Sequence, residues 1–389
     1  MAVIALIDGE HHPQGVRDVL DRLDLAGVIF CGGEEKLPPG SLDDVYGRPV
    51  QTGPEEALRR LAPGAEAVVD LADEPVLPPS EKLRLAALAL HLGLRYEAAG
   101  VRLDPPRYEP VAFDGLKLAV IGTGKRTGKT AVAGHWARLL RERGVDPVLV
   151  CMGRGGPPEP RVAAADIGLS DLLEIAATGA HAASDYLEDA VLAGVRTVGC
   201  RRVGGGLAGA PWESNVPAGA QLAASLPGAE ALLFEGSGSC IPPVEVDRTV
   251  CVIGPREPQP LAEYALLRAQ LLLAHEDAAA PPEAVRFTLL AEPAEPLPDG
   301  ARVALFTTGG SGCEGVEPVV TSTNLARRAA LAADLESAAA AGCDVYLTEL
   351  KAAAIDTVAR HALERDARVV FVRNRPVGVD DALMELAGA

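Results

Sequence analysis

Residues 117–134 combine the side chains and the spacing of a nucleotide-binding loop. An apolar run leads into Gly122-Thr123-Gly124-Lys125-Arg126-Thr127-Gly128-Lys129-Thr130, which opens a helix. In such a loop, backbone N–H groups and the helix N-terminus bind phosphate oxygens. Lys129 would contact the β- and γ-phosphates, and the Thr130 hydroxyl would ligate Mg²⁺. The loop residues predicted to bind the nucleotide are Gly122, Thr123, Gly124, Thr127, Gly128, Lys129 and Thr130.

A helix cap without a ligand is the alternative interpretation of the same residues. The apolar strand before the loop and the amphipathic helix after it, closed by Gly144, supply the context that a phosphate site requires. This context favours nucleotide binding.

Glu235 stands at a position where a carboxylate could bind a metal ion. It follows the apolar run Ala231 to Phe234 and begins Glu235-Gly236-Ser237-Gly238-Ser239. An acid at the end of such a strand holds Mg²⁺ directly or through water in nucleotide enzymes. The predicted metal ligands are therefore Thr130 and Glu235.

Arginines near glycines indicate a site for an anionic substrate. Arg154 follows a strand predicted at Pro147 to Val150, and Arg201 and Arg202 precede three consecutive glycines at 204–206. Glycine lets the backbone approach an anion, and arginine offers paired donors. A flexible surface loop with solvated arginines is the alternative.

The C-terminal segment places polar residues after its strands. Strands are predicted at residues 302–306, 318–321, 345–348 and 369–372. Because the carboxyl ends of parallel strands share one edge of a sheet, the residues that follow should converge on one crevice. Some of them, Thr323 or Asn324, would cap helices. The predicted anion ligands here are Glu349, Lys351, Arg373 and Arg375.

These sites need three α/β segments to position them. Alternating strand-like and helical runs predict an N-terminal domain at 1–106, a central phosphate-loop domain at 113–276 and a C-terminal domain at 284–389. The boundaries fall at Asp104-Pro105-Pro106 and in a proline-rich linker from Pro281 to Pro298. The fold class is α/β: a central P-loop NTPase domain with a parallel sheet, flanked by smaller Rossmann-like domains.

Composition restricts the partners. The chain has 389 residues and a net charge of −18, which disfavours nucleic acid and anionic membranes. No apolar run approaches the roughly 20 residues that span a bilayer, and the N-terminus does not read as a secretory signal, so we expect a cytoplasmic protein. Seven scattered cysteines indicate neither a disulfide framework nor a zinc site. A homodimer is the default assembly.

The loop spacing resembles that of dethiobiotin synthetase and its relatives, which use ATP to activate a small acid before ring closure. Partner-gated ATPases of the same group carry a signature lysine where this chain has Gly124. Longer motifs resemble the cyclic 2,3-diphosphoglycerate synthetases over most of the chain. They are D-G-E-H from Asp8, the loop from Gly122, G-R-G-G-P from Gly153, G-C-R-R-x-G-G-G-L-A-G-A-P from Gly199, E-G-S-G-S from Glu235 and E-L-K-A-A-A from Glu349.

This resemblance implies an ATP-dependent ligase that closes an anhydride between the two phosphates of 2,3-bisphosphoglycerate and releases ADP and phosphate, with Mg²⁺ and K⁺. Positive side chains are needed to bring such a polyanion against ATP. The residues expected to stabilise the transferring phosphoryl group or the substrate are Lys129, Lys125, Arg126 and Glu235 as catalytic residues, and Arg154, Arg201, Arg202, Glu349, Lys351, Arg373 and Arg375 as substrate ligands.

Two other functions remain open from the sequence. One is a small-acid kinase or carboxylate-activating ligase of the dethiobiotin synthetase type, and the other is a nucleotide-gated partner-binding ATPase. The polar cluster Asp8, Glu10, His11 and His12 fits either a ligand site at a strand end or a turn with a helix cap near Pro13.

Overall fold

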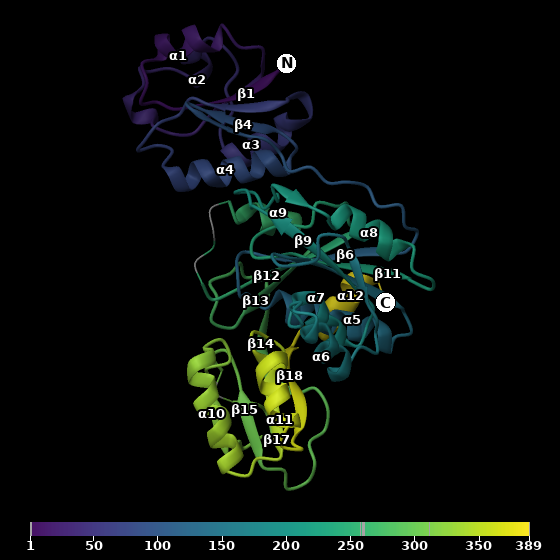
Figure 1. Ribbon diagram of the computed structural model, residues 1–389. Coiled ribbons are helices and arrows are strands. Elements are labelled where there is room, and N and C mark those ends of the chain that lie inside the picture. Colours follow the sequence, from purple (N-terminus) through teal and green to yellow (C-terminus); the bar gives the residue numbers. More distant parts are fainter. Residues whose placement is uncertain (1, 257, 259–260, 311, 389) are drawn as a thin grey trace. The chain divides into compact units, whose positions relative to one another are not determined.

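The computed structural model describes residues 2–256, 258, 261–310 and 312–388. The chain forms two compact α/β units, coloured along the sequence in Figure 1. The first comprises Met1–Arg107, Gly206–Ala210 and Pro258–Arg268, and the second Tyr108–Gly205, Pro211–Glu257 and Ala269–Ala389. The predicted α/β class is confirmed. No described helix has the length and apolar character needed to cross a bilayer.

The first unit contains a five-stranded sheet in the order β2-β1-β3-β4-β5. The first four strands in this order form three parallel pairs, and β5 pairs antiparallel with β4. The strands are β1 (Val3–Ile7), β2 (Leu25–Phe30), β3 (Ala67–Asp70), β4 (Arg95–Ala98) and β5 (Val101–Leu103). The helices are α1 (Pro13–Leu20), η1 (Glu34–Lys36), α2 (Leu42–Tyr46), α3 (Pro54–Leu61), η2 (Ala62–Gly64), α4 (Pro79–His91) and α9 (Glu263–Arg268).

Helix α1 begins where local sequence chemistry predicts. Pro13 occupies its first turn, and His12 Nδ1 accepts a hydrogen bond from the Gln14 backbone N–H at 3.3 Å. Val16 and Leu20 then pack against Ile7 and Val28 of the sheet. His12 is therefore a helix cap, one of the two roles that the sequence allowed.

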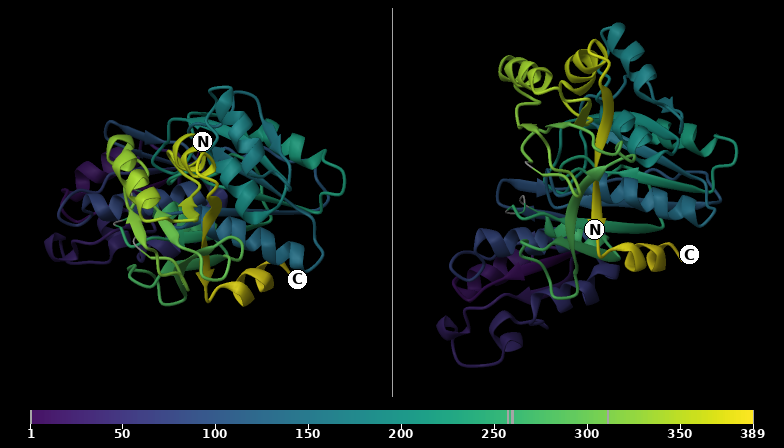
Figure 2. Two further views of the ribbon diagram at one scale, coloured as in Figure 1. Left: turned by 60° about the horizontal axis from the view of Figure 1, so that its bottom comes forward. Right: turned by 90° about the horizontal axis from the view of Figure 1, so that it is seen from below.

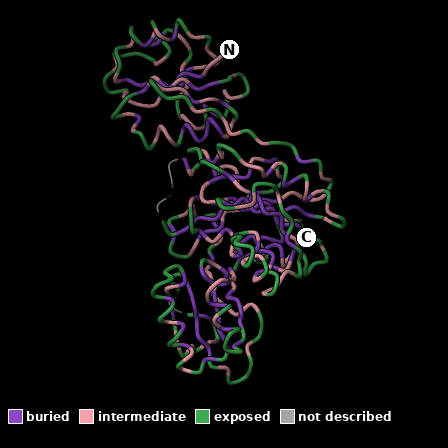
Figure 3. The backbone as a smooth tube through the Cα atoms, in the orientation of Figure 1, coloured by how far each residue is buried: buried purple, intermediate pink, exposed green. Residues whose placement is uncertain are grey.

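The second unit is built on a 13-stranded sheet in the order β10-β9-β7-β11-β6-β12-β13-β14-β18-β17-β15-β16, with β8 paired to β9. Figure 3 shows that its central strands are buried. The strands are β6 (Leu116–Gly122), β7 (Pro147–Gly153), β8 (Arg161–Ala163), β9 (Thr197–Val203), β10 (Glu213–Ser214), β11 (Ala231–Glu235), β12 (Arg248–Ile253), β13 (Leu271–His275), β14 (Val285–Pro293), β15 (Val303–Phe306), β16 (Val320–Ser322), β17 (Val345–Glu349) and β18 (Arg368–Val377).

Helices cover this sheet and supply much of its core. On α5, Val132, Trp136 and Leu140 pack on Leu118 and Leu233 of neighbouring strands. The helices are α5 (Lys129–Glu142), α6 (Leu169–Ala177), α7 (Asp185–Ala193), α8 (Val216–Ala224), α10 (Arg328–Ala340), the π-helix η3 (Ala354–Ala359), α11 (Arg360–Leu363) and α12 (Asp380–Ala387).

At strand β14 the strands of the sheet change direction. Residues 285–287 of β14 pair parallel with β13, whereas residues 288–293 pair antiparallel with β18. Figure 2 shows β14 in green and β18 in yellow running side by side. The strands beyond β18 thus lie past the carboxyl ends of the first group and point back toward them. This arrangement brings residues that follow strands of both groups to one cavity.

Two local predictions were wrong. The proline-rich segment from Pro281 to Pro298 is not a linker throughout, because it contains β14, whose Phe287 is buried. The last strand does not end at Val372 but continues to Val377, so Arg373 and Arg375 lie within it rather than after it. Both errors have one cause: the pairing of β14 with β18 satisfies their backbones at long range, which local composition does not reveal. The proposed division of residues 113–389 into two domains stays a prediction.

Candidate active site

The glycine-rich loop joins β6 to α5 as the sequence predicts. Gly128 precedes α5 with φ of 97°, a left-handed conformation that favours glycine. Gly122 is closely packed, since a Cβ there would lie 2.7 Å from Thr127 Oγ1 and 2.8 Å from the Val252 carbonyl oxygen. The first N–H groups of α5 have no partner within the helix and can bind an anion. The loop therefore has the geometry of a phosphate cradle.

Lys129 lies folded over this loop. Its Nζ donates a hydrogen bond to the Gly124 carbonyl oxygen at 2.7 Å, and the side chain is buried. Burial lowers its pKa to about 8, against the opposing effect of the Glu235 carboxylate. A cavity of about 790 Å³ opens beside it, lined from the loop by Lys125, Arg126, Thr127, Gly128, Lys129 and Thr130. Gly122, Thr123 and Gly124 shape the loop but do not line the cavity.

Thr130 and Glu235 meet as the metal prediction requires. The Thr130 hydroxyl donates a 2.5 Å hydrogen bond to Glu235 Oε1, because β11 lies directly beside β6 in the sheet. Glu235 is buried, and burial followed by the nearby Asp185 carboxylate raises its pKa. A cation placed here would offset both effects.

Helix α7 adds acidic side chains that the sequence analysis missed. Ligand atoms of Cys151, Asp189 and Glu235 all lie within 4.8 Å of one another. The Cys151 thiol donates to Asp189 Oδ2 at 2.8 Å. Burial and the Glu235 carboxylate raise the pKa of Asp189, and burial and the Asp189 carboxylate hold the pKa of Cys151 well above its ordinary value. Asp185, Glu188 and Asp189 stand at helical spacing on α7, a signal that could have been read from the sequence.

These donors fit magnesium. Mg²⁺ prefers oxygen ligands from one or two carboxylates and keeps several waters. Thr130, Glu235 and Asp189 offer a hydroxyl and two carboxylates, whereas the protonated Cys151 thiol is not a ligand of this kind. The cluster thus matches a hard cation brought with a nucleotide rather than a thiolate-bound metal.

The opposite wall of the cavity comes from the C-terminal strands. It includes Thr308, Gly309 and Gly310 after β15, Lys351 after β17 and Arg373 on β18. Lys351 Nζ lies 3.3 Å from Glu188 Oε1 on α7. Burial raises the pKa of Glu188 to about 7 despite this lysine. Lysine and arginine outnumber acidic residues along the cavity, in a chain whose net charge is −18.

Of the three central arginines, Arg154 lines the cavity. Arg202 is buried and donates to the carbonyl oxygens of Ser237 at 2.9 Å and Gly204 at 2.6 Å. The positive charges of Arg154 and Arg202 both contribute to the lowered pKa of Lys129, which puts them near the cradle. Arg201 does not line the cavity. Neighbouring side chains on a strand such as β9 point to opposite faces, which separates Arg201 from Arg202.

The remaining predicted substrate ligands have partners within the protein. Glu349 accepts hydrogen bonds from the Thr308 N–H at 2.8 Å and hydroxyl at 2.7 Å, so it holds the loop that lines the cavity. Arg373 and Arg375 both donate to Glu292 on β14. Glu349 and Arg375 do not line the cavity, whereas Arg373 does.

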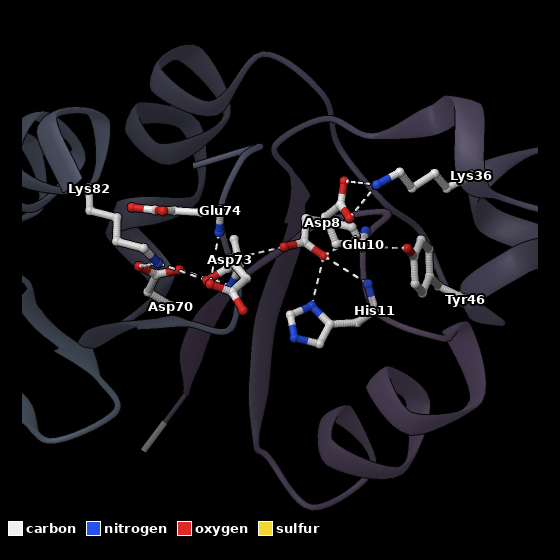
Figure 4. Close-up of polar contacts among 10 residues, drawn as sticks. Asp8, Glu10, His11, Lys36, Tyr46, Asp70, Asp73, Glu74 and Lys82 are labelled. Atoms are coloured by element: carbon white, nitrogen blue, oxygen red, sulfur yellow. Dashed lines mark hydrogen bonds and ion pairs between the residues drawn. The ribbon is translucent and has the colours of Figure 1, made fainter. Parts of the chain in front are cut away.

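The polar cluster of the first unit is satisfied internally (Figure 4). The Asp8 carboxylate is buried and accepts hydrogen bonds from the backbone and imidazole of His11, from the Glu10 N–H and from the Asp73 N–H. Glu10 pairs with Lys36. Asp8 thereby links the segments that follow β1 and β3 through hydrogen bonds. This arrangement is typical of a residue that stabilises the fold.

Family models match all three segments of the chain. The P-loop domain of cyclic 2,3-diphosphoglycerate synthetase matches residues 117–268, its N-terminal domain matches 2–104 and its C-terminal domain matches 311–375. The match of the P-loop model spans the loop, α7 and Glu235, which form one side of the cavity.

Curated relatives match over almost the whole length. The cyclic 2,3-diphosphoglycerate synthetase of Rubrobacter xylanophilus is 44% identical, with 100% of this chain and 98% of the relative covered. That of Thermococcus gammatolerans is 38% identical, with 97% and 94% covered.

Among solved structures, the LpxK of Aquifex aeolicus in complex with ATP is 11% identical, with a TM-score of 0.41 over 71% of this chain and 88% of LpxK. The family assignment does not depend on that distant likeness. From the three domain matches and the full-length relatives, the chain is an ATP-dependent ligase that belongs to the cyclic 2,3-diphosphoglycerate synthetase family.

Proposed function

We propose that this protein uses ATP to close the internal phosphoanhydride of cyclic 2,3-diphosphoglycerate from 2,3-bisphosphoglycerate, releasing ADP and inorganic phosphate. The observation that carries the proposal is the single cavity in which the phosphate loop, the Glu235–Asp189 pair and the C-terminal cations face one another. The names of the full-length relatives support the same reaction.

The charges of the cavity suit this substrate. Two phosphates and a carboxylate must approach the triphosphate of ATP, and unit charges 4 Å apart interact by about 4 kcal/mol at an effective dielectric of 20. Lys125, Arg126 and Arg154 stand on the side of the loop, and Lys351 and Arg373 stand on the opposite wall. Their charges offset the repulsion between the two reactants.

The positions of the residues near the loop support the following roles. The loop amides and Lys129 bind the β- and γ-phosphates, while Lys125 and Arg126 approach the transferring group from the exposed side of the cavity. Thr130, Glu235 and Asp189 would hold Mg²⁺. Bound there, Mg²⁺ would neutralise phosphate charge and polarise the γ-phosphoryl group.

The proposed chemistry has two displacements. An oxygen of one substrate phosphate attacks the γ-phosphorus of ATP, and the bond to the β-phosphate oxygen breaks to give ADP. An oxygen of the neighbouring phosphate then attacks the phosphorus of the first substrate phosphate and expels inorganic phosphate, which retains one substrate oxygen. Phosphate oxygens are ionised at neutral pH, so neither step requires a general base.

Phosphorus NMR of the product tests the proposal. Purified protein with Mg·ATP, K⁺ and 2,3-bisphosphoglycerate is expected to give a cyclic pyrophosphate resonance together with ADP and phosphate. A phosphorylated or acylated product without a cyclic anhydride would instead indicate the kinase or carboxylate-activating ligase. ATP turnover that needs no small acid and rises with a protein partner would indicate the partner-gated ATPase.

An isotope experiment tests whether the first displacement forms a phosphorylated intermediate of the substrate. When ¹⁸O is placed in the substrate phosphates, the proposed intermediate transfers it to the released phosphate. Unlabelled phosphate would reject that intermediate while leaving the overall reaction intact.

Other features of the proposal have separate grounds. The use of K⁺ rests on the family resemblance, the homodimer is the default assembly, and the cytoplasmic location rests on the sequence pattern. Direct substrate contacts by Arg201, Arg202, Glu349 and Arg375 rest on the motifs in which these residues stand. Glu349 contributes through the Thr308 loop in any case, because its carboxylate binds both polar groups of Thr308.

A further inference from the structure

Arg138 lines the cavity although no sequence motif pointed to it. It lies on α5, nine residues after Lys129, which corresponds to about 13 Å along the helix axis. Side chains of a helix lean toward its N-terminus, so Arg138 extends over the turn that contains Gly134. Gly134 also lines the cavity and leaves this turn without a side chain. The guanidinium group therefore borders the cavity beyond the phosphate loop.

The hydrogen-bond partners of Arg138 are uncharged groups, so they orient the guanidinium without forming an ion pair with it. Its Nη2 contacts His135 Nδ1 at 3.0 Å, and its Nη1 donates to the Leu192 carbonyl oxygen at 3.4 Å. Within the described part of the chain, no carboxylate forms an ion pair with Arg138. Arg373 differs, because two of its nitrogens donate to Glu292.

The state of His135 follows from these contacts. Since a guanidinium can only donate, His135 Nδ1 must accept, and the proton then resides on Nε2. Nε2 lies 2.8 Å from Asp380 Oδ1 on α12 and donates to it. Burial lowers the pKa of His135, which favours this neutral form. Asp380 thus fixes the imidazole, and the imidazole fixes Arg138.

An arginine in this setting favours an anion. Burial, followed by the charge of Arg373, lowers the pKa of Arg138 to about 10, although the Glu292 and Glu142 carboxylates act in the opposite direction. On balance the protein gives this cation less stabilisation than water would. A phosphate or carboxylate in the cavity would supply the missing charge and accept paired hydrogen bonds from the guanidinium. The ATP phosphates occupy the other end of the cavity in the proposed reaction.

We propose that Arg138 binds an anionic group of the small-molecule substrate, either a phosphate or the carboxylate, and that His135 is its positioning residue. The identity of the substrate rests on the proposed function, but the anion subsite rests on Arg138, its neutral partners and the cavity. The subsite fixes the end of the substrate that lies away from ATP.

Calorimetric titration with 2,3-bisphosphoglycerate, on protein saturated with Mg²⁺ and a non-hydrolysable ATP analogue, tests this inference. Arg138→Gln is expected to raise the Kd of 2,3-bisphosphoglycerate by about 10- to 100-fold, the effect of losing a charge-assisted hydrogen bond. The Kd of the ATP analogue should stay unchanged. Arg141→Gln is the matched control, because Arg141 is on the same helix, is exposed and donates to the Gly194 carbonyl oxygen.

Two further variants keep the inference testable if Arg138→Gln does not fold. Arg138→Lys keeps the charge but loses the planar fork, and should give an intermediate Kd. His135→Leu removes the positioning contact while Arg138 remains, and should raise KM for the substrate with little change in kcat. A melting temperature near that of the wild type qualifies each variant for comparison. Wild-type substrate affinity in folded Arg138→Gln or Arg138→Lys protein would overturn the inference.

The outcomes separate this inference from the proposed function. Formation of cyclic product by the wild type, with unchanged binding in Arg138→Gln, rejects the subsite and keeps the function. Weaker binding in Arg138→Gln without cyclic product from the wild type rejects the function and keeps the subsite. If the wild type does not bind 2,3-bisphosphoglycerate, inorganic pyrophosphate is the probe, and equal or absent binding by wild type and variant rejects the subsite.

Discussion

The Lys351 ammonium lies 3.3 Å from the buried Glu188 carboxylate, and this contact joins the segment after β17 to helix α7. The two walls of the cavity are therefore linked by an ion pair as well as by the sheet. Glu188 is almost fully buried, whereas the Lys351 side chain is 41% exposed. The Coulombic effect of Lys351 lowers the pKa of Glu188, which burial raises.

Loss of the lysine should destabilise the protein. Lys351→Met leaves the Glu188 carboxylate buried without its partner, and we expect a loss of about 1–2 kcal/mol in the free energy of unfolding, reduced from the value for a fully buried pair because Lys351 is exposed. Urea denaturation of Lys351→Met, Glu188→Gln and the double variant measures the coupling. Strict additivity of the two single effects would show that the pair does not stabilise the fold.

Asp189 is expected to belong to the metal site with Glu235 and Thr130. Asp189→Asn and Glu235→Gln should each weaken Mn²⁺ binding by at least about 10- to 100-fold, the range seen when residues that only orient the ligands of a metal site are changed. Electron paramagnetic resonance of Mn²⁺ in the presence of ADP measures this directly. Cys151→Ser is the matched control, because its protonated thiol only donates to Asp189. Equal Mn²⁺ affinity in Asp189→Asn and the wild type would remove Asp189 from the site.

Two glycines of the phosphate loop should respond differently to substitution. A Cβ at Gly122 would approach the Val252 carbonyl oxygen to 2.8 Å, whereas a Cβ at Gly124 meets nothing within 4 Å. Gly122→Ala is expected to lower the free energy of unfolding by about 1–3 kcal/mol and to weaken nucleotide binding, because the backbone of the loop or of Val252 must shift to make room for the Cβ. Gly124→Ala should leave both nearly unchanged. Thermal unfolding and fluorescent-nucleotide titration of the two variants provide the comparison, and similar losses in both would contradict this view of the loop.

The phosphate loop was predictable because its information is local. Gly122, Gly128 and Lys129 follow one another within a few residues, and the backbone conformation that they require leaves few alternatives. The meeting of Thr130 with Glu235 was predictable with one added rule, that the ends of parallel strands share an edge. The same rule predicted a crevice at the strand ends of the C-terminal segment, where Lys351 lies, but it did not predict that this crevice is shared with the phosphate loop.

Other parts of the site depend on pairings that no short pattern encodes. Asp189 enters the site because α7 packs beside α5 and β7. Arg138 enters it because α5 packs against β18. The antiparallel pairing of β14 with β18 decides which residues of Arg373 to Arg375 face the cavity. Proline content at residues 281–298 predicted a linker, yet β14 forms where Phe287 finds an apolar core. These features follow from tertiary packing, which overrides local propensity.

The pH dependence of stability is expected to report on His135. Burial lowers the pKa of His135 below its ordinary value of 6.5, with Asp380 opposing and Arg138 and Arg375 reinforcing the shift. The unfolded chain therefore binds this proton more readily than the native state does. Its contribution to stability is fully present above pH 6.5 and is lost as the pH falls toward the native pKa. His135→Gln does not titrate, and its amide can still accept from Arg138. Urea denaturation between pH 7.5 and 5 should show the wild type losing stability relative to His135→Gln, while parallel curves for the two proteins would show that His135 binds a proton equally well in both states.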